Sequence, residues 1–574
     1  MGSRPIIEYD EQEAYLKIRG GSKMRVVIVG GVAGGMSAAT RLRRLSEETE
    51  IIVLDKGPYV SFANCALPYY MSGEISQRDS LIVESPAHLK KRFNIDVRPN
   101  TEVVDIVPEQ HQVTAVHNGQ TETLQYDRLI LSPGSKAAIP TIGGLAEADN
   151  VFTLRSIPDV DKIMADLNKG AKTAAVIGAG SVGLEAVENL TKRGLDTTLI
   201  EAGDHILPFM DYEMAAIVSR ETAKHGVTLK LKTKVNRIAD HFLELSDGTQ
   251  LQADIVIVAV GVVPDTQLAQ KSGIKTGDNG GIIVDDRYRT SADDVYAVGD
   301  AILVNQILTG ERVSIPLASP ANRQGRQVAD VIMGENRRNQ GGIGTAIVRS
   351  FDMAAAATGL NTAQLKQAGI RYQAVHITGQ SHAAYYPGGT PLSLKLIFDP
   401  QSGELYGAQA VGKASADKRI DVLSVAIKHR MTVFDLPEFE LSYAPPFGSA
   451  KDPVNMIGYA AENLVEGLSE NIQFDEVDAA VKAGAYLVDV RNPKELTRDG
   501  RLPNAVNIPL DELRSRLAEL PKDRQLIVSC RSGQRSYIAE RILKNHGFKV
   551  KNLDGAFLTY SAAYPQRIQH SGGK

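Results

Sequence analysis

Two glycine-rich turns, each set between an apolar strand and a helix, constrain this chain of 574 residues more than any other feature. The first follows MRVVIV at 24–29, and its helix leads to a second strand, IIVLD, at 51–55. The other begins at 173 with TAAVIGAGSVGLEAVENLTKRG and closes with TTLIEAG. Continuous β-branched runs that alternate with helical spacing predict parallel βαβ units. We therefore expect an α/β protein with two nucleotide-binding halves.

The second turn fits the pattern G-x-G-x-x-G with Gly178, Gly180 and Gly183. These glycines allow a tight turn, a close backbone approach to a pyrophosphate at a helix N-terminus, and close packing of helix on strand. Glu201 ends the next strand, where a carboxylate binds a ribose 2′-hydroxyl and repels a 2′-phosphate. This unit is therefore predicted to bind NADH in preference to NADPH.

The first turn is less regular, because Gly30 and Gly35 hold the outer positions while Val32 replaces the middle glycine. A turn with a purely structural role is the alternative interpretation. Asp55 follows at the end of the next strand and can bind a ribose, which favours a second dinucleotide. Further along, Asp300 in VYAVGDA offers a carboxylate beside a helix N-terminus.

Composition excludes several classes of partner. A formal charge of −4 and a pI near 6.3, with dispersed basic residues, give no electrostatic reason to expect nucleic acid. No stretch approaches a membrane span, and the start lacks a signal-peptide core. Two cysteines make no disulfide framework, and no Cys/His cluster appears, so we expect no metal site and a reducing, cytoplasmic location.

Shifts in pattern along the chain predict four domains and an extension. After the two nucleotide-binding halves come strands such as LSLKLIF with helices such as RIDVLSVAIKHR, and then a last α/β segment containing YLVDVR and QLIVSC. The expected ranges are 24–150 with 265–345 for the first dinucleotide domain, 151–264 for the second, 346–460 for a third domain, 473–574 for the last, and 1–23 for a leader or extension.

One cysteine, Cys65, lies in the tight apolar segment SFANCALPYY at 61–70, just after the first nucleotide-binding unit. A buried structural cysteine is the simplest interpretation of such a residue. The context favours chemistry instead, because the segment adjoins a predicted cofactor site.

Taken together, the two glycine units, the SFxxC-type cysteine and VYAVGDA resemble the flavoprotein disulfide reductases that bind two dinucleotides. The resemblance implies FAD in the first unit and NADH in the second. Within that family, SFANCALPY and YAPPFGSAKDP are similar to the coenzyme A disulfide reductases, and the last domain resembles rhodanese. Residues 24–574 thus resemble fusions of the two, including NADH-dependent persulfide reductases, with an α+β dimerisation domain at 346–460.

This resemblance implies a catalytic role for Cys65. The dithiol members carry a second cysteine five residues on, where this chain has Tyr70, so Cys65 pairs with sulfur from outside the protein. Its thiolate would attack coenzyme A persulfide, polysulfide or coenzyme A disulfide, and two electrons from NADH would pass through FAD to release the product.

The same resemblance implies a coenzyme A site. Arg41 and Arg44 would meet the adenosine phosphates, with Ser61 and Asn64 near the pantetheine. The alternative for the two arginines is a solvated helix face.

Two tyrosines of a partner subunit would complete the site in a homodimer. The matching positions are Tyr443 in YAPPF and Tyr385 in HAAYYPGG, with Tyr386 a weaker candidate. A phenol there could donate a proton to the leaving sulfur, whereas core tyrosine is the competing interpretation.

The second cysteine, Cys530, begins CRSGQRS after an apolar strand and before a helix. Successive backbone N–H groups can wrap around its sulfur and stabilise a persulfide anion. VDVR and LPNAVNIP add to the rhodanese resemblance, although RLPNA replaces the usual HIPGA. Cys530 is therefore expected to accept sulfane sulfur and pass it to coenzyme A, unless the domain is inactive. The predicted loop comprises Arg531, Ser532, Gly533, Gln534 and Arg535.

Three alternatives stay open at the level of sequence. An NADH oxidase or peroxidase would cycle Cys65 through a sulfenic acid, although GGVAGGMSA lacks the histidine that peroxidases place in this loop. A second is simple coenzyme A disulfide reduction, against which the fused rhodanese-like domain argues. The third is a sulfur carrier or redox sensor without turnover.

Overall fold

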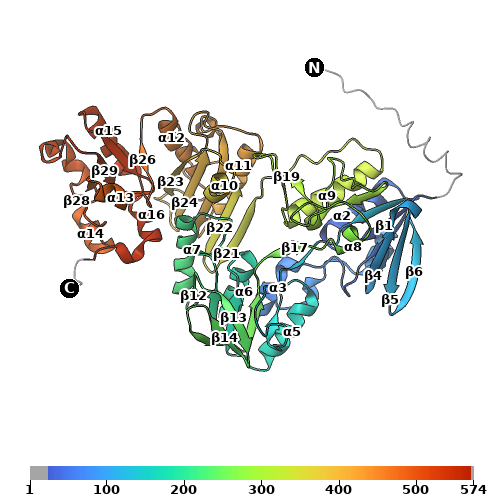
Figure 1. The fold of residues 1–574 in the computed structure, drawn as a ribbon. Helices are drawn as coiled ribbons and strands as arrows, with labels where there is room; N and C mark the ends of the chain where they lie inside the picture. The colour runs from blue at the N-terminus through green and yellow to red at the C-terminus, as the bar shows by residue number, and fades with distance from the viewer. Residues whose placement is uncertain (1–22, 571–574) are drawn as a thin grey trace, which may run out of the picture.

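The computed structural model describes residues 23–570, and it confirms the predicted mixed α/β fold class (Figure 1). The leader expected at 1–23 lies outside the described residues, apart from Lys23. Within 23–570, none of the helices has the length and apolar character of a membrane span.

The first unit is a parallel five-stranded sheet with its core on both faces. One strand arrives from far along the chain, because the sequence returns to this sheet after completing the second unit. Helix α2 (Ala33–Leu45) packs against α9 (Ala318–Ile332) so closely that a Cβ at Gly325 would lie 2.1 Å from the oxygen of Gly34. In spatial order the strands are β18 (Val295–Ala297), β7 (Arg128–Leu131), β1 (Arg25–Val29), β2 (Glu50–Leu54) and β3 (Asp96–Arg98).

The second unit repeats this plan with another parallel sheet of five strands. Its helices are α5 (Ile157–Asn168), α6 (Ser181–Lys192) and α7 (Tyr212–Lys224). Apolar side chains on both faces of the sheet form its core. The strand order is β12 (Thr228–Lys230), β11 (Asp196–Ile200), β10 (Thr173–Ile177), β16 (Ile255–Val258) and β9 (Val151–Phe152).

Each unit also carries a three-stranded antiparallel sheet that the sequence pattern did not predict. A further antiparallel pair, β8 (Ser135–Ala137) with β17 (Val262–Pro264), lies where the chain leaves the first unit and where it returns. The antiparallel sheets comprise β4 (Thr101–Val107), β5 (Gln112–His117) and β6 (Gln120–Gln125), then β13 (Val235–Ala239), β14 (Phe242–Leu245) and β15 (Gln250–Gln252).

The third domain is an antiparallel sheet of five strands covered by α11 (Ala416–Lys428) and α12 (Pro453–Val465). Its inward side chains form one apolar core with these helices. The strand order is β21 (Ala346–Ser350), β22 (Met353–Gly359), β25 (Leu405–Gly412), β24 (Pro391–Phe398) and β23 (Gln373–Gln380).

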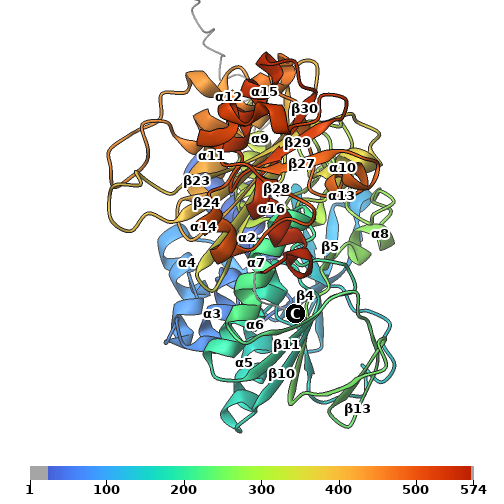
Figure 2. The same ribbon diagram turned by 90° about the vertical axis from the view of Figure 1, so that its left-hand side faces the viewer.

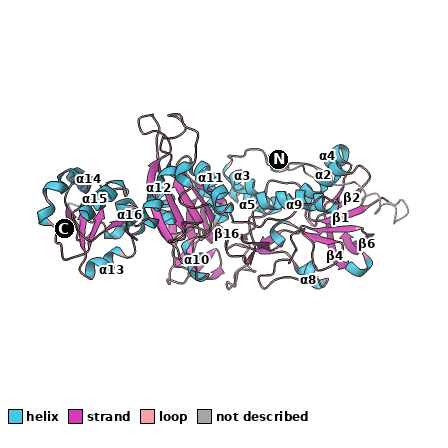
Figure 3. Cartoon of the chain, turned by 90° about the horizontal axis from the view of Figure 1, so that it is seen from above, coloured by secondary structure: helices cyan, strands magenta, loops and turns pink. Residues whose placement is uncertain are grey.

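The C-terminal domain lies at the end of the molecule opposite the first unit, with the third domain between them (Figures 1 and 3). Its parallel sheet is flanked by α13 (Val477–Lys482), α14 (Pro493–Asp499), α15 (Gln534–Asn545) and α16 (Ala556–Ala563). The strand order is β26 (Asn471–Ile472), β30 (Val550–Leu553), β29 (Leu526–Ser529), β27 (Tyr486–Asp489) and β28 (Val506–Asn507).

The C-terminal domain also contacts the second unit, because α16 packs against α7 (Figure 2). Arg220 of α7 donates a hydrogen bond to the backbone oxygen of Ser561 at 2.7 Å, and the Tyr212 phenol donates one to Ala563 O at 3.3 Å. The domain therefore touches both the third domain and a helix of the second nucleotide-binding unit.

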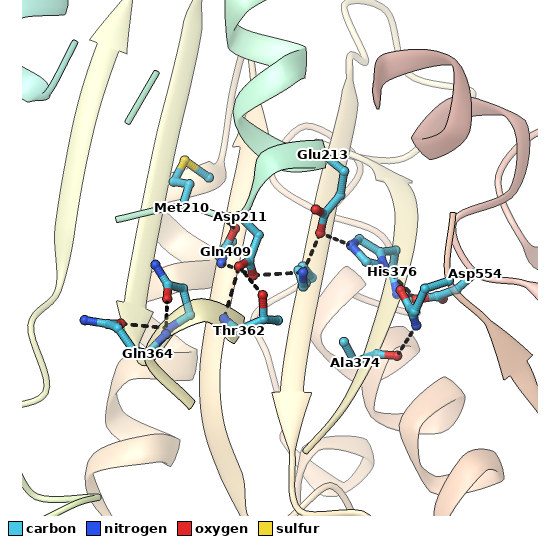
Figure 4. A network of polar contacts seen from close by, with 12 residues as sticks. Met210, Asp211, Glu213, Thr362, Gln364, Ala374, His376, Gln409 and Asp554 are labelled. Atoms are coloured by element: carbon cyan, nitrogen blue, oxygen red, sulfur yellow. Dashed lines mark hydrogen bonds and ion pairs between the residues drawn. The ribbon is translucent and has the colours of Figure 1, made fainter. Parts of the chain in front are cut away.

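A buried charged network joins these three domains (Figure 4). His376 of β23 binds Asp554 of the C-terminal domain through Nδ1 at 2.6 Å and Glu213 of α7 through Nε2 at 2.9 Å. Lys395 of β24 pairs with the same Glu213 and with Asp211. All five side chains are at most 5% exposed.

The surroundings of the histidine in this network favour its charged form. Burial by itself lowers the pKa of His376, but the charge of Asp554 and the hydrogen bonds to Asp554 and Glu213 raise it to about 9. Burial likewise opposes the charge on Glu213, yet Lys395 and His376 hold the pKa of this carboxyl well below its usual range. Paired, desolvated charges thus join the C-terminal domain to the other two domains, and removing one partner would leave a buried charge uncompensated.

Candidate functional site

One cavity of about 1460 Å³ runs between the two nucleotide-binding units. Its lining includes Gly30 and Asp55 of the first unit, Gly178 and Glu201 of the second, and Cys65 between them. The structure therefore brings both glycine turns and one cysteine to a single space.

The first glycine turn has no room for side chains. Gly30 has φ of +97°, and a Cβ there would lie 2.1 Å from the backbone oxygen of Ser132. A Cβ at Gly35 would lie 1.9 Å from the oxygen of Gly30. Both positions therefore require glycine, although the pattern lacks its middle glycine at Val32.

The second turn is built in the same way. Gly178 has φ of +101°, and a Cβ at Gly183 would lie 1.9 Å from the oxygen of Gly178. At Gly180, in contrast, nothing lies within 4 Å of the Cβ position. The backbone is thus open at the point where the pattern allows a pyrophosphate to approach.

The two strand-end carboxylates make identical contacts. The Asp55 carboxylate accepts hydrogen bonds from the backbone N–H of Gly31 at 2.7 Å and from that of Gly57 at 2.8 Å. The Glu201 carboxylate accepts the equivalent pair of hydrogen bonds, from the backbone N–H of Ala179 at 2.8 Å and from that of Gly203 at 2.7 Å. Each carboxylate thus pins its glycine turn to the neighbouring strand and keeps lone pairs free for a ribose.

Both turns fit a dinucleotide, since their outer glycines pack against backbone too closely for a Cβ and the turns open into the large cavity. Burial raises the pKa of Asp55, although its two backbone hydrogen bonds act in the opposite direction. Asp300 also lines the cavity and accepts a hydrogen bond from the Ser135 hydroxyl at 3.0 Å.

Cys65 lies in a 3₁₀ turn, Asn64–Ala66, that leads into α3 (Leu67–Ser72). The side chain is exposed within the cavity rather than buried in a core. Asn64 Oδ1 accepts a hydrogen bond from the Cys65 backbone at 3.0 Å and lies 3.7 Å from its sulfur. The interpretation of Cys65 as a buried structural cysteine is therefore wrong.

The surroundings of Cys65 favour the neutral thiol. Desolvation by the cavity walls raises its pKa, and the carboxylates of Glu185 and Asp300 raise it further, while Arg155 opposes them. The sulfur is accessible to a small molecule, yet enough protein surrounds it to weaken hydration of a thiolate.

The residues expected at a coenzyme A site do not all lie in one place. Arg41 Nε pairs with the buried Asp330 of α9 at 2.6 Å. Arg44 is largely exposed. Partial burial, together with the charges of Arg41 and Arg326, lowers its pKa. Of the four expected residues, the cavity lining includes Asn64.

Arg41, Arg44 and Ser61 are not among the described residues that line the cavity. Ser61 has φ of +45°, and its backbone oxygen accepts a hydrogen bond from the N–H of Val83 at 2.8 Å. It therefore shapes the backbone of the segment that leads to Cys65.

Tyr385 and Tyr443, distant in sequence, meet on the surface of the third domain. Their hydroxyl oxygens are 2.7 Å apart, and this hydrogen bond raises the pKa of Tyr385. The side chains are 74% and 47% exposed, so the interpretation of both as core tyrosines is wrong. Tyr386 contacts the ring of His382 edge-on instead.

Cys530 follows β29 and lies at the start of the loop that leads to α15. Its sulfur is nearly inaccessible, with 1% of the residue exposed. The Gly533 N–H donates a hydrogen bond to Sγ at 3.2 Å and the Ser536 hydroxyl donates another at 3.4 Å. One backbone N–H thus donates to the sulfur where the sequence predicted several in succession, and the Ser536 hydroxyl adds a donor from the first turn of α15.

The two loop arginines bind carboxylates of the α14 segment. Arg535 makes a bidentate pair with Glu495, both bonds at 2.7 Å. Arg531 is more exposed and lies 3.8 Å from Asp499. Between them, Ser532 and Gly533 complete the loop, and Gln534 begins α15.

Sequence reasoning missed three side chains near the two sulfurs: Glu185, Arg155 and Ser536. A signal existed for Glu185, which lies in the helix directly after G-x-G-x-x-G and so starts near the cavity. Ser536 was within reach of the same reasoning, since it closes the CRSGQRS segment.

This fold, with two dinucleotide cradles joined by one cavity, defines a class of nucleotide-dependent oxidoreductases. The chain belongs to the pyridine nucleotide-disulphide oxidoreductase family, whose model matches residues 24–325, with the family's dimerisation domain at 345–452 and a rhodanese-like domain at 473–563.

Individual relatives cover most of the chain. It is 36% identical over 444 residues to coenzyme A disulfide reductase of Staphylococcus haemolyticus, covering 77% of this chain and all of that protein. The structure of reduced CoADR-RHD from Bacillus anthracis matches with a TM-score of 0.94 at 47% identity, covering 96% of this chain and 99% of that one. The structure of a NAD-dependent persulfide reductase from A. fulgidus matches with a TM-score of 0.89 at 38% identity, covering 94% of this chain and 100% of that one.

Proposed function

We propose that this protein is an NADH-dependent flavoprotein that reduces sulfur–sulfur bonds of coenzyme A persulfide, polysulfide or coenzyme A disulfide through Cys65. The observation that carries the proposal is the single cavity that joins both glycine turns past this cysteine. The similarity to a coenzyme A disulfide reductase and a persulfide reductase supports the same class of substrate.

Each cofactor would be held by one of the two equivalent cradles. Gly30, Gly35 and Asp55, with Asp300 from the returning chain, would hold FAD in 24–150 and 265–345. In 151–264, the G-x-G-x-x-G turn with Glu201 would hold NADH. FAD supplies the acceptor for the hydride of NADH and the donor of two electrons to sulfur.

The sulfur chemistry begins at the Cys65 thiolate. Its sulfur attacks R–S–S–R′, a Cys65–S–S–R bond forms, and R′S⁻ leaves and takes a proton. Two electrons then cleave the mixed disulfide to regenerate Cys65 and release RSH. The overall reaction, NADH + H⁺ + R–S–S–R′ → NAD⁺ + RSH + R′SH, is balanced with one proton taken up.

A homodimer would complete the site, through the dimerisation domain at 346–460. The hydrogen-bonded pair Tyr385 and Tyr443 is exposed on this domain, as a group offered to a second subunit would be. One phenol can then protonate the leaving sulfur while the other orients it. Arg41 and Arg44 would bind coenzyme A phosphates, with Ser61 and Asn64 beside the pantetheine. The cytoplasmic location stays a prediction.

The domain at 473–574 would act as a sulfurtransferase. Cys530 accepts sulfane sulfur, and the donors at Gly533 and Ser536 stabilise the persulfide. Coenzyme A then takes the sulfur from Cys530 and carries it to Cys65.

Replacing each cysteine tests this division of labour. Cys65→Ser should abolish NADH-dependent sulfide release while flavin absorbance stays unchanged. Cys530→Ser is the matched control and should spare reduction of coenzyme A persulfide but impair the use of bulk polysulfide. Full reductase turnover in the Cys65 variant would disprove the assignment.

An NADH oxidase or peroxidase is the second candidate, favoured by the accessibility of Cys65 to small oxidants in the cavity. Comparing NADH consumption with peroxide, oxygen and polysulfide distinguishes the two. A sulfur carrier or redox sensor would release at most one sulfide per site with NADH in excess, so counting turnovers tests that alternative.

A further inference from the structure

The edge strand of the third domain lies against the C-terminal domain. β23 is the last strand of its sheet, so every second residue turns its backbone N–H and C=O away from β24. The His376 N–H, one of these outward groups, donates a hydrogen bond to Asp554 Oδ1 at 2.9 Å (Figure 4). The Ala374 oxygen accepts bonds from the side chains of Asn471 at 2.8 Å and Gln473 at 3.2 Å. The edge of β23 is therefore completed by side chains of the C-terminal domain.

His376 holds the same aspartate twice and also contacts the turn that follows it. Its ring Nδ1 lies 2.6 Å from Asp554 Oδ2, in addition to the backbone bond to Oδ1. A Cβ at Gly555 would lie 3.0 Å from the His376 Cβ. Gly555 and Ala556 have φ of +63° and +52°. An alanine in the left-handed region is strained and persists only where its surroundings hold it, so this turn depends on restraints such as the His376–Asp554 pair.

The turn is bound directly to the backbone of Cys530. β30 and β29 are neighbouring parallel strands, and Asp554 and Cys530 follow their carboxyl ends. The Phe557 N–H donates a hydrogen bond to the Cys530 oxygen at 3.1 Å, and the Leu558 N–H donates one to the Arg531 oxygen at 3.0 Å. The start of α16 therefore fixes the backbone of the first two residues of the loop that begins at Cys530.

The backbone of His376 also faces this loop from the other side. Its oxygen lies 4.0 Å from the position of a Cβ at Gly533, the residue whose N–H donates to the Cys530 sulfur at 3.2 Å. Cys530 and His376 are 1% and 5% exposed, so these contacts are shielded from water. One residue of the third domain thus restrains both ends of the hydrogen bond to the sulfur: Cys530 through Asp554 and α16, and Gly533 through the His376 oxygen.

We propose that His376 is a positioning residue of the sulfurtransferase site, which the third domain completes. The inference rests on the sulfurtransferase role proposed above for Cys530. In that role the Cys530 thiolate attacks the outer sulfur of a donor such as thiosulfate, the persulfide Cys530–S–S⁻ forms, and sulfite leaves with the electron pair of the bond that breaks. An acceptor thiolate or cyanide then takes the outer sulfur, which regenerates the Cys530 thiolate.

His376 acts on this chemistry through the geometry of the loop. The thiolate and the persulfide are both anions, and the Gly533 N–H stabilises them only while Cys530 and Gly533 keep their relative position. Without the His376 ring, Asp554 keeps the bond from Gln473 at 3.1 Å but loses its charged partner. The strained turn that follows is then free to relax, and with it the start of α16.

Three variants in a Cys65→Ser background test this role. His376→Leu removes the ring contact to Asp554, whereas His376→Asn places an amide N–H near the position of Nδ1 and so can keep that bond. Asp211→Asn is the matched control, because it perturbs the other end of the same buried network. None of the hydrogen bonds and ion pairs described for Asp211 reaches Asp554 or the Cys530 loop.

The first readout is the pH dependence of Cys530 alkylation by iodoacetamide. His376→Leu should move this profile to higher pH by up to about one unit, the equivalent of one hydrogen bond to a charged group. His376→Asn should restore most of the profile of the parent protein, and Asp211→Asn should leave it in place. Calorimetry of the same variants measures separately how far each lowers the stability of the C-terminal domain.

The second readout is sulfur transfer from thiosulfate to cyanide. His376→Leu should lower kcat about tenfold, which is the same change in free energy, and leave KM for thiosulfate nearly unchanged. His376→Asn should recover most of this loss, because the bond to Asp554 is kept.

An alkylation profile of His376→Leu that coincides with that of the parent protein would overturn the proposal. Equal shifts in all three variants would overturn it too, since that pattern marks lost stability alone. Should His376→Leu fail to fold, Asp554→Asn deletes the charge of the same pair and should shift the profile in the same direction, and an unmoved profile there is equally contrary. If the wild-type protein transfers no sulfur from thiosulfate or polysulfide, the sulfurtransferase function fails, whereas the alkylation profile still decides whether His376 positions Cys530.

Discussion

Removing one carboxylate should loosen the attachment of the C-terminal domain. Asp554→Asn keeps the shape of the side chain but deletes the charge that faces His376 at 2.6 Å. Raising the pKa of His376 from 6.5 to about 9 corresponds to about 3 kcal/mol of differential interaction at about 1.4 kcal/mol per unit. Breaking buried ion pairs costs a similar amount, about 3–5 kcal/mol. Because Glu213 supplies part of this shift and stays in place, we expect a loss of at most about 3 kcal/mol.

The pH dependence has a definite sign. The pKa of His376 is raised in the folded protein, so its stabilising contribution is complete below about pH 6.5 and is lost as pH rises towards 9. Glu213 has a lowered pKa, so its contribution is present above pH 4.5 and is lost as pH falls below that value. In wild type, docking of the C-terminal domain should be strongest between these limits.

Calorimetric unfolding of the full-length protein at pH 6, 7.5 and 9, with hydrogen exchange of β23 and α16, measures the effect. Asp554→Asn should lower the transition of the C-terminal domain at pH 6 and 7.5, and the difference from wild type should shrink by pH 9. Asp511→Asn, an exposed aspartate of the same domain, is the control. An unchanged transition at pH 6, or a difference from wild type that grows with pH, would refute the reasoning.

Three other substitutions test the two sites. Gly35→Ala places a methyl group 1.9 Å from the oxygen of Gly30, so the purified protein should lack flavin absorbance. Gly183→Ala makes the equivalent clash with the second turn and should abolish NADH binding in a fluorescence titration while flavin stays bound. Ser536→Ala removes one donor from the Cys530 sulfur, worth about 1 kcal/mol. This should slow alkylation of Cys530 in a Cys65→Ser background about fivefold, and an unchanged rate would show that the hydroxyl does not stabilise the thiolate.

The parallel sheets could be predicted because their strands are continuous β-branched runs that end in obligatory glycines such as Gly30 and Gly178. The three-stranded antiparallel sheets of the two units could not, because strands such as QTETLQ at 120–125 are largely exposed and polar and so carry no apolar alternation.

For the side chains, too, features within a local motif were predictable and contacts between distant parts of the chain were not. Cys65, Cys530 and Glu201 were predictable, because each occupies a fixed place in a local motif. The partners of Arg41 and His376 were not, since Asp330 and Asp554 lie 289 and 178 residues away from them. Only the folded chain brings such pairs together.

The paired strands β8 and β17 limit how the two nucleotide-binding units can move. Both chain crossings between the units run through this short antiparallel ladder, three residues long on each side. A two-stranded ribbon twists and bends readily but does not stretch, because its backbone is already extended. The ladder therefore resists lengthening of the span between the two cofactor cradles, and α3, which packs against α5 and α6 of the second unit, restrains the angle between them.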